Sequence, residues 1–416
     1  MPICIWLRGG MVDTMDSKSI GATRVGSSPT GATIYFSVDS RNNFPMHIEL
    51  DSDTLFTAIK TVAHAVVNSP TTPILENVLL RATNERLTVI ANNLEMAIEY
   101  TIEKDIEIKE PGDITVSFRF LASYLNLLDP TRLKIKTDTG HTLNFTANKQ
   151  KMRYKGLGAD EFPMIPATRR DIKFRMNGDI LKRAFSKTLF SCASGNIRPT
   201  LAGVYIQVHT DHVTFASTDS FRLSEYRYNV DTGVDKKIAI ILPARSASEI
   251  MKTLPDGVDV DMYFADNQIL LVYENVLLYS RLLNGHFPDY ANFFPKSTSV
   301  NALTNRSKLV QSLRQVSLVA RENNFNVKMS LESSGALRLD SGDTEIGAGE
   351  TELAADVEGN DQVGLNATYF IDALQVIEGE DVRIGFETSL SPILIQGTSL
   401  NTKEEDFRHI IMPLKI

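Results

Sequence analysis

The stretch Leu55-Phe-Thr-Ala-Ile-Lys-Thr-Val-Ala-His-Ala-Val66 decides the fold. Leu55, Ile59, Val62 and Val66 recur at i, i+4, i+7 and i+11, which is the apolar stripe of an amphipathic helix. The same spacing returns 126 residues later and again 128 residues after that, in Leu181, Phe185, Thr188 and Cys192 and then in Leu309, Leu313, Val316 and Ala320. Each stripe opens a block of similar length, so the sequence predicts three copies of one domain.

The rest of each block repeats as well. Short runs with period-two alternation follow each stripe and indicate half-buried antiparallel strands: 77–82 and 87–91, then 203–208 and 213–217, then 326–331 and 337–339. A second apolar stripe follows in each block, at Leu121/Tyr124/Leu125/Leu128, Ala247/Ile250/Met251/Leu254 and Phe370/Ala373/Leu374/Ile377. We therefore expect an α+β fold of three repeated domains, 46–166, 167–296 and 297–416, each with two helices packed on antiparallel sheets.

Composition sets outer bounds on the class of protein. The 416 residues are 43% hydrophobic and 23% charged, which is ordinary for a globular protein. No run reaches the roughly 18 apolar residues that a spanning helix needs. The two cysteines, Cys4 and Cys192, provide no disulfide framework, so a reducing cytosol is the expected compartment. The net charge of −8 argues against a wholly basic surface but leaves room for a local basic face.

Residues 1–45 differ from everything after them. They contain the single tryptophan, Trp6, and a Gly/Ser/Thr-rich stretch at 21–33, and they have no counterpart in the later blocks. A disordered tail, a targeting segment and a stretch that is not native coding sequence are all open. We expect a disordered or non-native extension, with the native chain starting near Met46.

The usual signatures of catalysis and metal binding do not occur. Gly26 to Gly31 has the glycine spacing of a phosphate loop, but Ala32-Thr33 stands where Lys-Ser/Thr is needed. The seven histidines lack metal-ligand spacing, and no nucleophile–base arrangement can be assembled. The sequence therefore predicts no catalytic residue, no metal site and no cofactor, and it favours a scaffold or binding ring over an enzyme.

Basic residues recur on the predicted helices, where they form either an ordinary solvated face or one shared surface for phosphate groups. If the helices of three like domains line one concave surface, each adds one or two positive charges to it. Contacts of this kind hold duplex DNA without reading its sequence.

Several motifs resemble one family over most of the chain. They are 70–75 (PTTPIL), 93–96 (NLEM), 217–223 (STDSFRL), 285–290 (GHFPDY) and 411–416 (IMPLKI). From Met46 to Ile416 the sequence resembles the β subunit of bacterial DNA polymerase III, the replicative sliding clamp. The resemblance implies a non-catalytic, bacterial, cytoplasmic and nucleoid-associated protein. It implies that two copies join head to tail into a ring around duplex DNA, which tethers the clamp loader and the replicative and repair polymerases through short hydrophobic peptides.

The resemblance also implies a partner-peptide cleft between the second and third domains. The matching positions are Leu201, Thr218, Ser220, Phe221, Arg222, Leu223, Pro288, Phe293, Phe325, Asn366, Tyr369, Leu390, Pro392, Ile410, Met412, Pro413 and Leu414. Most of them are apolar, as a groove for a hydrophobic peptide requires. The family commonly has Gly-His where this chain has Ser220-Phe221, so the preferred peptide stays open. Leu201, Phe325 and Leu390 are alternatively simple core residues.

Two further surfaces follow from the same resemblance. The DNA-facing positions are Arg119, Lys149, Lys151, Arg198 and Arg245. The dimer interface pairs Met152 and Tyr154 of one copy with Val319 and Ala320 of the other, with Lys149, Lys151 and Arg153 near acidic partners. Two other classes stay open at this point: a DNA-binding regulatory protein that is not a clamp, and an enzyme of a new type.

Overall fold

The computed structural model describes residues 45–166, 168, 170, 173–195, 198–399 and 404–415. All of them belong to one compact unit, Asp39–Ile416. The extension expected at 1–45 lies outside the described residues, apart from Pro45.

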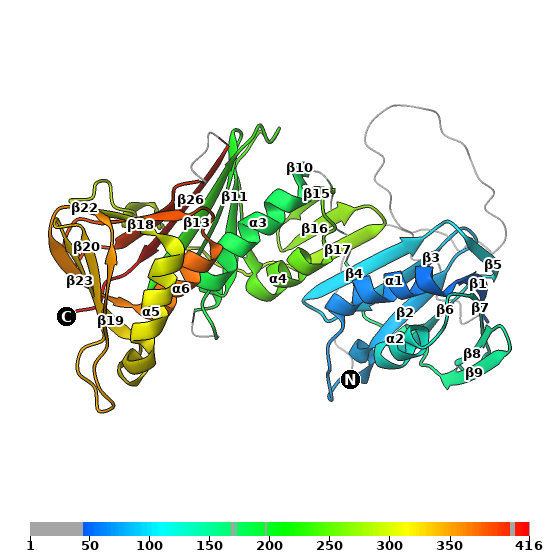
Figure 1. Cartoon of the computed structure of the whole chain (residues 1–416). Helices are drawn as coiled ribbons and strands as arrows, with labels where there is room; N and C mark the ends of the chain where they lie inside the picture. Colours follow the sequence, from blue (N-terminus) through cyan, green and yellow to red (C-terminus); the bar gives the residue numbers. More distant parts are fainter. Residues whose placement is uncertain are drawn as a thin grey trace, which may run out of the picture. The chain divides into compact units, whose positions relative to one another are not determined.

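The helices of the described residues come in three pairs (Figure 1). Within each pair the two helices contact each other. The pairs are α1 (Ser52–Val62) with α2 (Phe118–Asn126), α3 (Gly178–Thr188) with α4 (Ala244–Thr253), and α5 (Arg306–Ala320) with α6 (Ala367–Val376). The predicted repetition of a helix pair is therefore confirmed.

Asparagine side chains cap three of these helices. The Asn177 Oδ1 accepts a hydrogen bond from the Asp179 N–H at 2.9 Å and begins α3. The Asn305 side chain does the same for Lys308 on α5 at 3.1 Å. Each cap satisfies one of the backbone donors that a helix start leaves free, so the chain specifies these starts locally.

Several predicted stripes run past the ends of their helices. All four members of the third stripe lie on α5 and are buried. In the first stripe, however, α1 ends at Val62, a 3₁₀ turn follows, and Val66 is extended. Cys192 likewise follows a 3₁₀ turn beyond α3, and Leu128, Leu254 and Ile377 lie beyond α2, α4 and α6. Val66 and Cys192 still pack on the core. Burial therefore extends the apolar pattern further than the hydrogen-bonded helix does.

In the described part of the chain, the strands form four antiparallel sheets. The first has the order β5 (Ile106–Glu110), β1 (His47–Asp51), β7 (Arg132–Thr137), β8 (Thr142–Ala147), β9 (Gln150–Lys155). The second has the order β10 (Lys173–Asn177), β15 (Asp259–Ala265), β16 (Gln268–Tyr273), β17 (Val276–Arg281), β4 (Met96–Ile102), β3 (Leu87–Asn92), β2 (Asn77–Ala82), β6 (Gly112–Ser117).

The third and fourth sheets carry the later blocks. The third has the order β14 (Ile238–Pro243), β11 (Gly203–Val208), β12 (His212–Thr218), β13 (Arg222–Asn229), β26 (Glu405–Ile411), β25 (Ile393–Gly397), β24 (Asp381–Phe386), β18 (Val300–Asn305), β22 (Asp356–Glu358). The fourth has the order β21 (Glu350–Ala354), β20 (Ala336–Asp340), β19 (Asn326–Glu332), β23 (Asp361–Asn366). The alternating runs expected as strands are all strands.

Two of the sheets join strands from different blocks. β17 pairs with β4, with Leu278 opposite Ile98. β13 pairs with β26, with Leu223 opposite Ile410. The sequence does not reveal these pairings, because every strand presents the same hydrogen-bonding backbone. They matter because the second one builds the candidate site.

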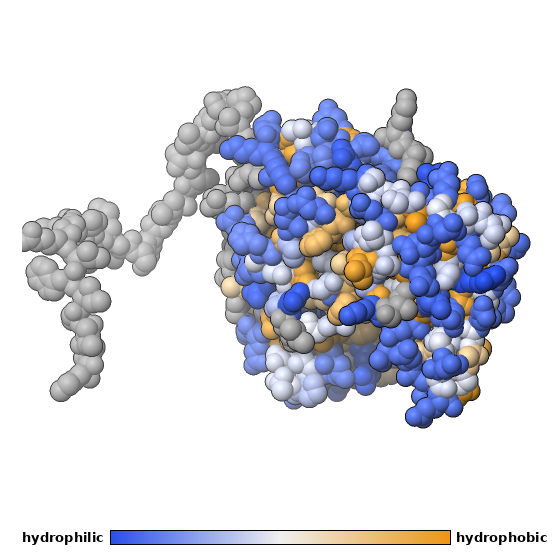
Figure 2. Space-filling view, turned by 90° about the vertical axis from the view of Figure 1, so that its left-hand side faces the viewer, coloured by the Kyte–Doolittle hydropathy of each residue, from blue (hydrophilic) through white to orange (hydrophobic). Residues whose placement is uncertain are grey.

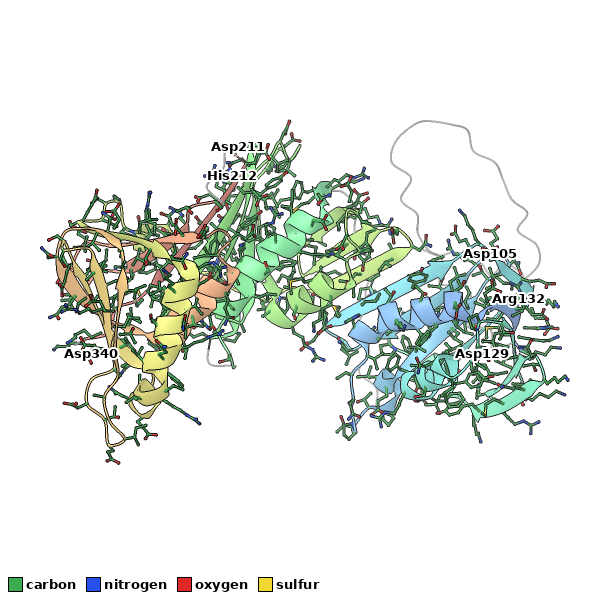
Figure 3. All side chains as sticks on the ribbon, viewed as in Figure 1. Asp105, Asp129, Arg132, Asp211, His212 and Asp340 are labelled. Atoms are coloured by element: carbon green, nitrogen blue, oxygen red, sulfur yellow. The ribbon has the colours of Figure 1, made fainter. Side chains whose placement is uncertain are left out.

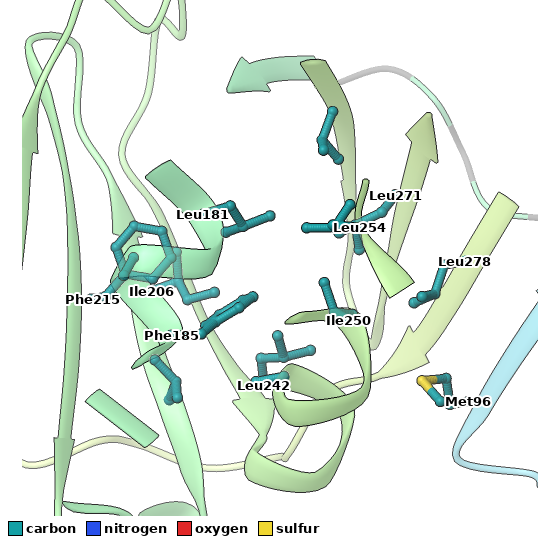
Figure 4. Close-up of a cluster of buried hydrophobic side chains, with 14 of the residues drawn as sticks. Met96, Leu181, Phe185, Ile206, Phe215, Leu242, Ile250, Leu254, Leu271 and Leu278 are labelled. Carbon is teal, nitrogen blue, oxygen red and sulfur yellow. The ribbon is translucent and has the colours of Figure 1, made fainter. Parts of the chain in front are cut away.

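The core lies between helices and sheets in every block. Figure 4 shows it in the second, where Leu181, Ile250 and Leu271 come from α3, α4 and β16. The Phe185 and Phe215 rings meet edge to face, with centroids 5.8 Å apart. Burial of such side chains is the main favourable term in folding. Within the described part of the chain, every helix is too short or too polar to span a bilayer.

Candidate functional site

The candidate site is built where β13 meets β26. The two strands are about 180 residues apart in sequence, yet Arg222 lies opposite Ile411 and Leu223 opposite Ile410. The chain after β26 stays close, because the Met412 N–H donates to the Phe221 carbonyl at 2.8 Å. The Leu414 N–H donates to the Gly364 carbonyl at 2.8 Å. The end of the chain is therefore part of the site.

Arg222 is the most constrained side chain of the site. Its guanidinium donates to Asp219 at 3.0 Å and to Asp372 on α6 at 2.7 Å. It also lies over the Tyr369 ring, 4.5 Å from the centroid. The Arg222 side chain is 11% exposed and forms an ion pair with each of two carboxylates. These contacts fix its position within the protein itself.

The predicted cleft residues divide into a floor and a rim. Leu201, Leu223 and Ile410 are at most 4% exposed and form an apolar floor. Phe221, Phe293, Leu390 and Met412 are exposed, with values from 36% to 73%. Exposed large apolar side chains next to a buried apolar floor are typical of a binding surface. Leu390 is 73% exposed, so the alternative that it is a core residue is wrong.

The other predicted members hold or border this surface. Thr218 accepts a hydrogen bond from the Ser220 N–H and donates one to the Arg222 carbonyl, which shapes the loop. Asn366 caps α6 and also donates to the Asn324 carbonyl at 2.9 Å. Half-buried or exposed side chains complete the set: Pro288, Phe325, Tyr369, Pro392, Pro413 and Leu414.

Sequence reasoning missed three residues that position Arg222. Asp219 and Asp372 supply its two carboxylate partners, and Phe190 lies under it with its ring centroid 5.4 Å away. Asp219 belongs to the quoted 217–223 motif and could have been included. Asp372 and Phe190 carry no local signal, because only the packing of α6 and of the turn after α3 brings them close.

The predicted DNA-facing residues lie on three kinds of element. Arg119 is exposed on α2 and Arg245 is exposed on α4. Lys149 and Lys151 lie just before and on β9, also exposed. Arg198 instead donates to the Ser220 hydroxyl at 2.8 Å, which brings its guanidinium to the candidate cleft.

The predicted interface residues lie on the edge strand β9 and near the end of helix α5. Met152 is 43% exposed on the edge strand β9, and the Tyr154 ring stacks on Phe120 at 3.8 Å. Val319 is half-buried near the end of α5, but Ala320 is fully buried in its own domain. Ala320 can therefore contribute only indirectly. The neighbouring Leu318 is 75% exposed, and the sequence analysis did not include it in the interface.

The block that carries α5 and β21 presents its own surface in Figure 2. Most of that surface is hydrophilic, and hydrophobic residues gather in a central area. Outward-facing Glu350 and Glu352 lie on the edge strand β21. The edge strand β9 is instead basic, with Lys151, Arg153 and Lys155 exposed. The two free edges are therefore opposite in charge.

Nucleophile and metal chemistry receive no support from the side chains. Among the described residues, no group of three His, Cys, Asp or Glu side chains could hold a metal ion. Burial raises the pKa of the Cys192 thiol to about 12. The thiol is therefore protonated at neutral pH and is not a nucleophile.

Comparison with known proteins defines the class of protein. The N-terminal, central and C-terminal domains of the DNA polymerase III beta subunit match residues 46–166, 175–289 and 291–415. The chain belongs to this family. It is a DNA sliding clamp, a non-catalytic processivity subunit of the polymerase III holoenzyme.

Individual relatives agree over the same region. The beta sliding clamp of Bacillus subtilis is 27% identical over 380 residues, covering 89% of this chain and all of the relative. A crystal structure of the B. subtilis sliding clamp superposes with a TM-score of 0.85 over 90% of this chain and all of that one. The polymerase III beta chain of Streptococcus pneumoniae gives 0.84 at 26% identity, covering 89% of this chain. These likenesses favour the clamp over a DNA-binding regulatory protein of another kind.

Proposed function

We propose that this clamp works as a head-to-tail homodimer that encircles duplex DNA in the bacterial cytoplasm, on the nucleoid. It tethers the clamp loader and the replicative and repair polymerases through short hydrophobic peptides in the cleft at the β13–β26 junction. A clamp does no chemistry, so its effect comes from raising the local concentration of enzymes on DNA. The three domains that we assign are 46–166, 167–296 and 297–416.

One observation carries the cleft proposal. The floor of Leu201, Leu223 and Ile410 is apolar and already formed, and the rim beside it exposes Phe221 and Met412. Binding energy in such sites concentrates in a few buried anchors. A peptide with two or three large apolar side chains fits this surface, because those side chains lose water on the floor while Arg222 stays paired to its carboxylates.

Deletion of 412–416 tests the cleft. The deletion removes the exposed Met412 and the two hydrogen bonds that hold this end of the chain, but β26 ends at Ile411 and keeps its pairing with β13. We expect affinity for a fluorescent polymerase-tail peptide to fall by at least tenfold while the sedimentation coefficient of the dimer is unchanged.

A matched control keeps this test specific. Leu94 is 52% exposed on a loop far from the cleft in sequence and has a positive φ of 74°, which asparagine tolerates. Leu94→Asn removes an exposed leucine of comparable size, and peptide affinity should not change. Equal affinity for the deleted and full-length proteins would show that the cleft lies elsewhere.

The dimer contact that we propose joins the two free sheet edges. The basic strand β9 of one copy lies against the acidic strand β21 of the other, with Met152 and Tyr154 facing Leu318 and Val319. An edge strand offers unpaired N–H and C=O groups to another strand. Opposite charges direct the correct edge to its partner and discourage β9 from pairing with itself.

The DNA contacts that we propose are sparse and exposed. Arg119 on α2 and Arg245 on α4 occupy corresponding helices of two blocks. Lys149 and Lys151, just before and on β9, add further positive charge, and Arg198 reaches Ser220 at the cleft. A few exposed cations attract phosphate groups without binding a particular base sequence, which suits a ring that must slide.

A further inference from the structure

A cavity lies on the same sheet as the cleft and shares Pro288 with it. We call it the outer pocket; its volume is about 450 Å³. Its lining includes Tyr205, His209, His212, Glu225, Arg227 and Lys237. They come from β11, β12, β13 and the segment before β14, and the segment 287–291 closes one side.

Strand register places this pocket beside the cleft. Thr218, Leu223 and Ile410 form one cross-strand row, and that row belongs to the cleft. Two residues along the strands, the next row on the same face is Ala216, Glu225 and Arg408. Alternate residues of a strand share a face, so consecutive rows are about 7 Å apart. A peptide leaving the cleft therefore needs only two or three extended residues to reach the pocket.

Aromatic contacts hold the wall of the pocket in place. The Tyr205 ring stacks on Phe287 with centroids 4.7 Å apart, and Tyr290 meets Tyr205 edge to face at 6.4 Å. Glu225, 7% exposed, accepts a hydrogen bond from the Arg408 Nε at 2.7 Å, and the Arg408 Nη2 lies 2.6 Å from the same carboxylate oxygen. The pocket is therefore formed in the absence of a ligand, and these two opposite charges neutralise each other.

The charged side chains that remain in the lining are two basic ones, Arg227 and Lys237, and one acidic one, Asp289. The Arg227 Nε donates to the neutral side chain of Asn229, at 2.9 Å. Lys237 is exposed and has no hydrogen-bond or ion-pair partner in the described part of the chain. Asp289 lines the pocket, and two further acidic groups are nearby: Asp406, the cross-strand neighbour of Arg227, and Asp211, beside His212.

Two histidines, His209 and His212, lie at the mouth of the pocket. Figure 3 shows His212 beside Asp211 at the tip of the β11–β12 hairpin, and their side chains lie 2.6 Å apart. The His209 ring stacks on His212 at 4.2 Å. Burial, followed by the charges of His212, Lys237 and Arg227, lowers the pKa of His209, with Asp211 acting against them. Burial, the largest of these causes, disfavours a charge on His209, and the neighbouring cations add to that effect.

We propose that the outer pocket binds acidic side chains that flank the hydrophobic peptide in the cleft. The inference rests on the proposed tethering function and adds a second determinant of partner choice. The cleft selects partners by apolar anchors, and the outer pocket, through Arg227 and Lys237, selects among them by charge. Partners with an acidic flank then bind more tightly than partners with the same anchors and a neutral flank.

Adjacent lysines supply a matched pair of variants. Lys237 lines the pocket and Lys236 does not, although both are exposed. The probes are the fluorescent polymerase-tail peptide, the same peptide with an Asp-Glu-Asp extension at either end, and the same peptide with Asn-Gln-Asn extensions. Each is titrated against the full-length protein, Lys237→Glu, Arg227→Gln and Lys236→Glu.

One acidic extension should raise affinity about fivefold over its neutral counterpart, which corresponds to two modest ion pairs. Lys237→Glu and Arg227→Gln should remove that gain and leave the unextended peptide unaffected, whereas Lys236→Glu should preserve it. The gain should also vanish in 1 M salt. Equal affinity for acidic and neutral extensions, or equal effects of the two lysine variants, would overturn the pocket. Failure of the unextended peptide to bind would instead overturn the tether.

Discussion

Residues far apart in the chain meet at His409, in the middle of β26. Its Nδ1 lies 2.8 Å from the Ser224 hydroxyl, which lies 2.7 Å from the Ser191 hydroxyl. The side chain is fully buried, and the charge of Arg222 is close enough to act on it. A small polar chain therefore runs from the turn after α3 into the strand that forms the cleft, and it links the floor of the cleft to the protonation state of one histidine.

Acid should destabilise the protein through this histidine. Burial, with a smaller effect of Arg222, lowers the pKa of His409 to about 3 from 6.5. Between those values the unfolded chain binds a proton that the folded chain excludes, so stability is full above pH 6.5 and is lost as the pH falls toward 3. At pH 4.5 the loss should be roughly 2–3 kcal/mol.

His409→Gln isolates this contribution. The free energy of unfolding is measured in urea at pH 7 and at pH 4.5. Its decrease from pH 7 to pH 4.5 should be smaller for the variant than for the natural chain. His286→Gln, at an exposed position, controls for the loss of a histidine and should leave the difference between the two pH values unchanged. Identical pH dependence in all three proteins would contradict the assignment to His409.

Edge strands decide assembly at the scale of single elements. β9 and β21 each end a sheet, and the first carries lysine and arginine where the second carries glutamate. Like charges on either edge oppose pairing of that edge with itself. The helix end next to β21 adds Leu318 and Val319, which give the contact an apolar centre.

Val319→Asp should convert dimers to monomers. In the proposed contact the new carboxylate would be buried without a partner, which costs several kcal/mol. Because Val319 is only half-buried in the single chain, the fold should survive, and circular dichroism should be unchanged. Sedimentation at micromolar concentration measures the assembly state. Val310→Asp, also half-buried on α5 but outside the proposed contact, is the control and should remain dimeric. A Val319→Asp protein that remains dimeric on dilution would refute this contact.

The whole molecule predicts how it should hold DNA. A net charge of −8 with a few exposed cations makes direct grip on duplex weak. Retention must then come from closure of the ring, which depends on topology and not on affinity. Salt distinguishes direct binding from topological retention, because it weakens contacts with phosphate but does not open a closed ring.

After loading by its clamp loader, the protein should stay on closed circular DNA and leave linear DNA through the free ends. Gel filtration after linearisation with a single-cut nuclease measures this. Retention on circles should persist at a salt concentration that abolishes binding to linear duplex. The monomeric Val319→Asp protein should be retained on neither circular nor linear DNA. Equal retention on circular and linear DNA would contradict encirclement.

Local periodicity was sufficient to predict the helix pairs and the two strands that follow the first helix of each block. Leu309, Leu313, Val316 and Ala320 are all on α5 and buried, because one helix face meets one core. The same argument failed at Val66 and Cys192, where the side chains remain packed but the backbone has left the helix. Apolar periodicity indicates which side chains are buried. It does not by itself indicate where the backbone hydrogen bonds of the helix end.

The sequence by itself determined the triplicated α+β domain, the family and the motifs around Arg222, because these depend on residue types at short, regular spacing. Only the tertiary structure decided that β13 pairs with β26, that Asp372 meets Arg222, and that a basic pocket lies about two strand rows from the cleft. Antiparallel strands all present the same backbone groups, so strand choice depends on the packing of whole domains. Contacts between residues 150 or more positions apart, such as Arg222 with Asp372, exist only once that packing is complete.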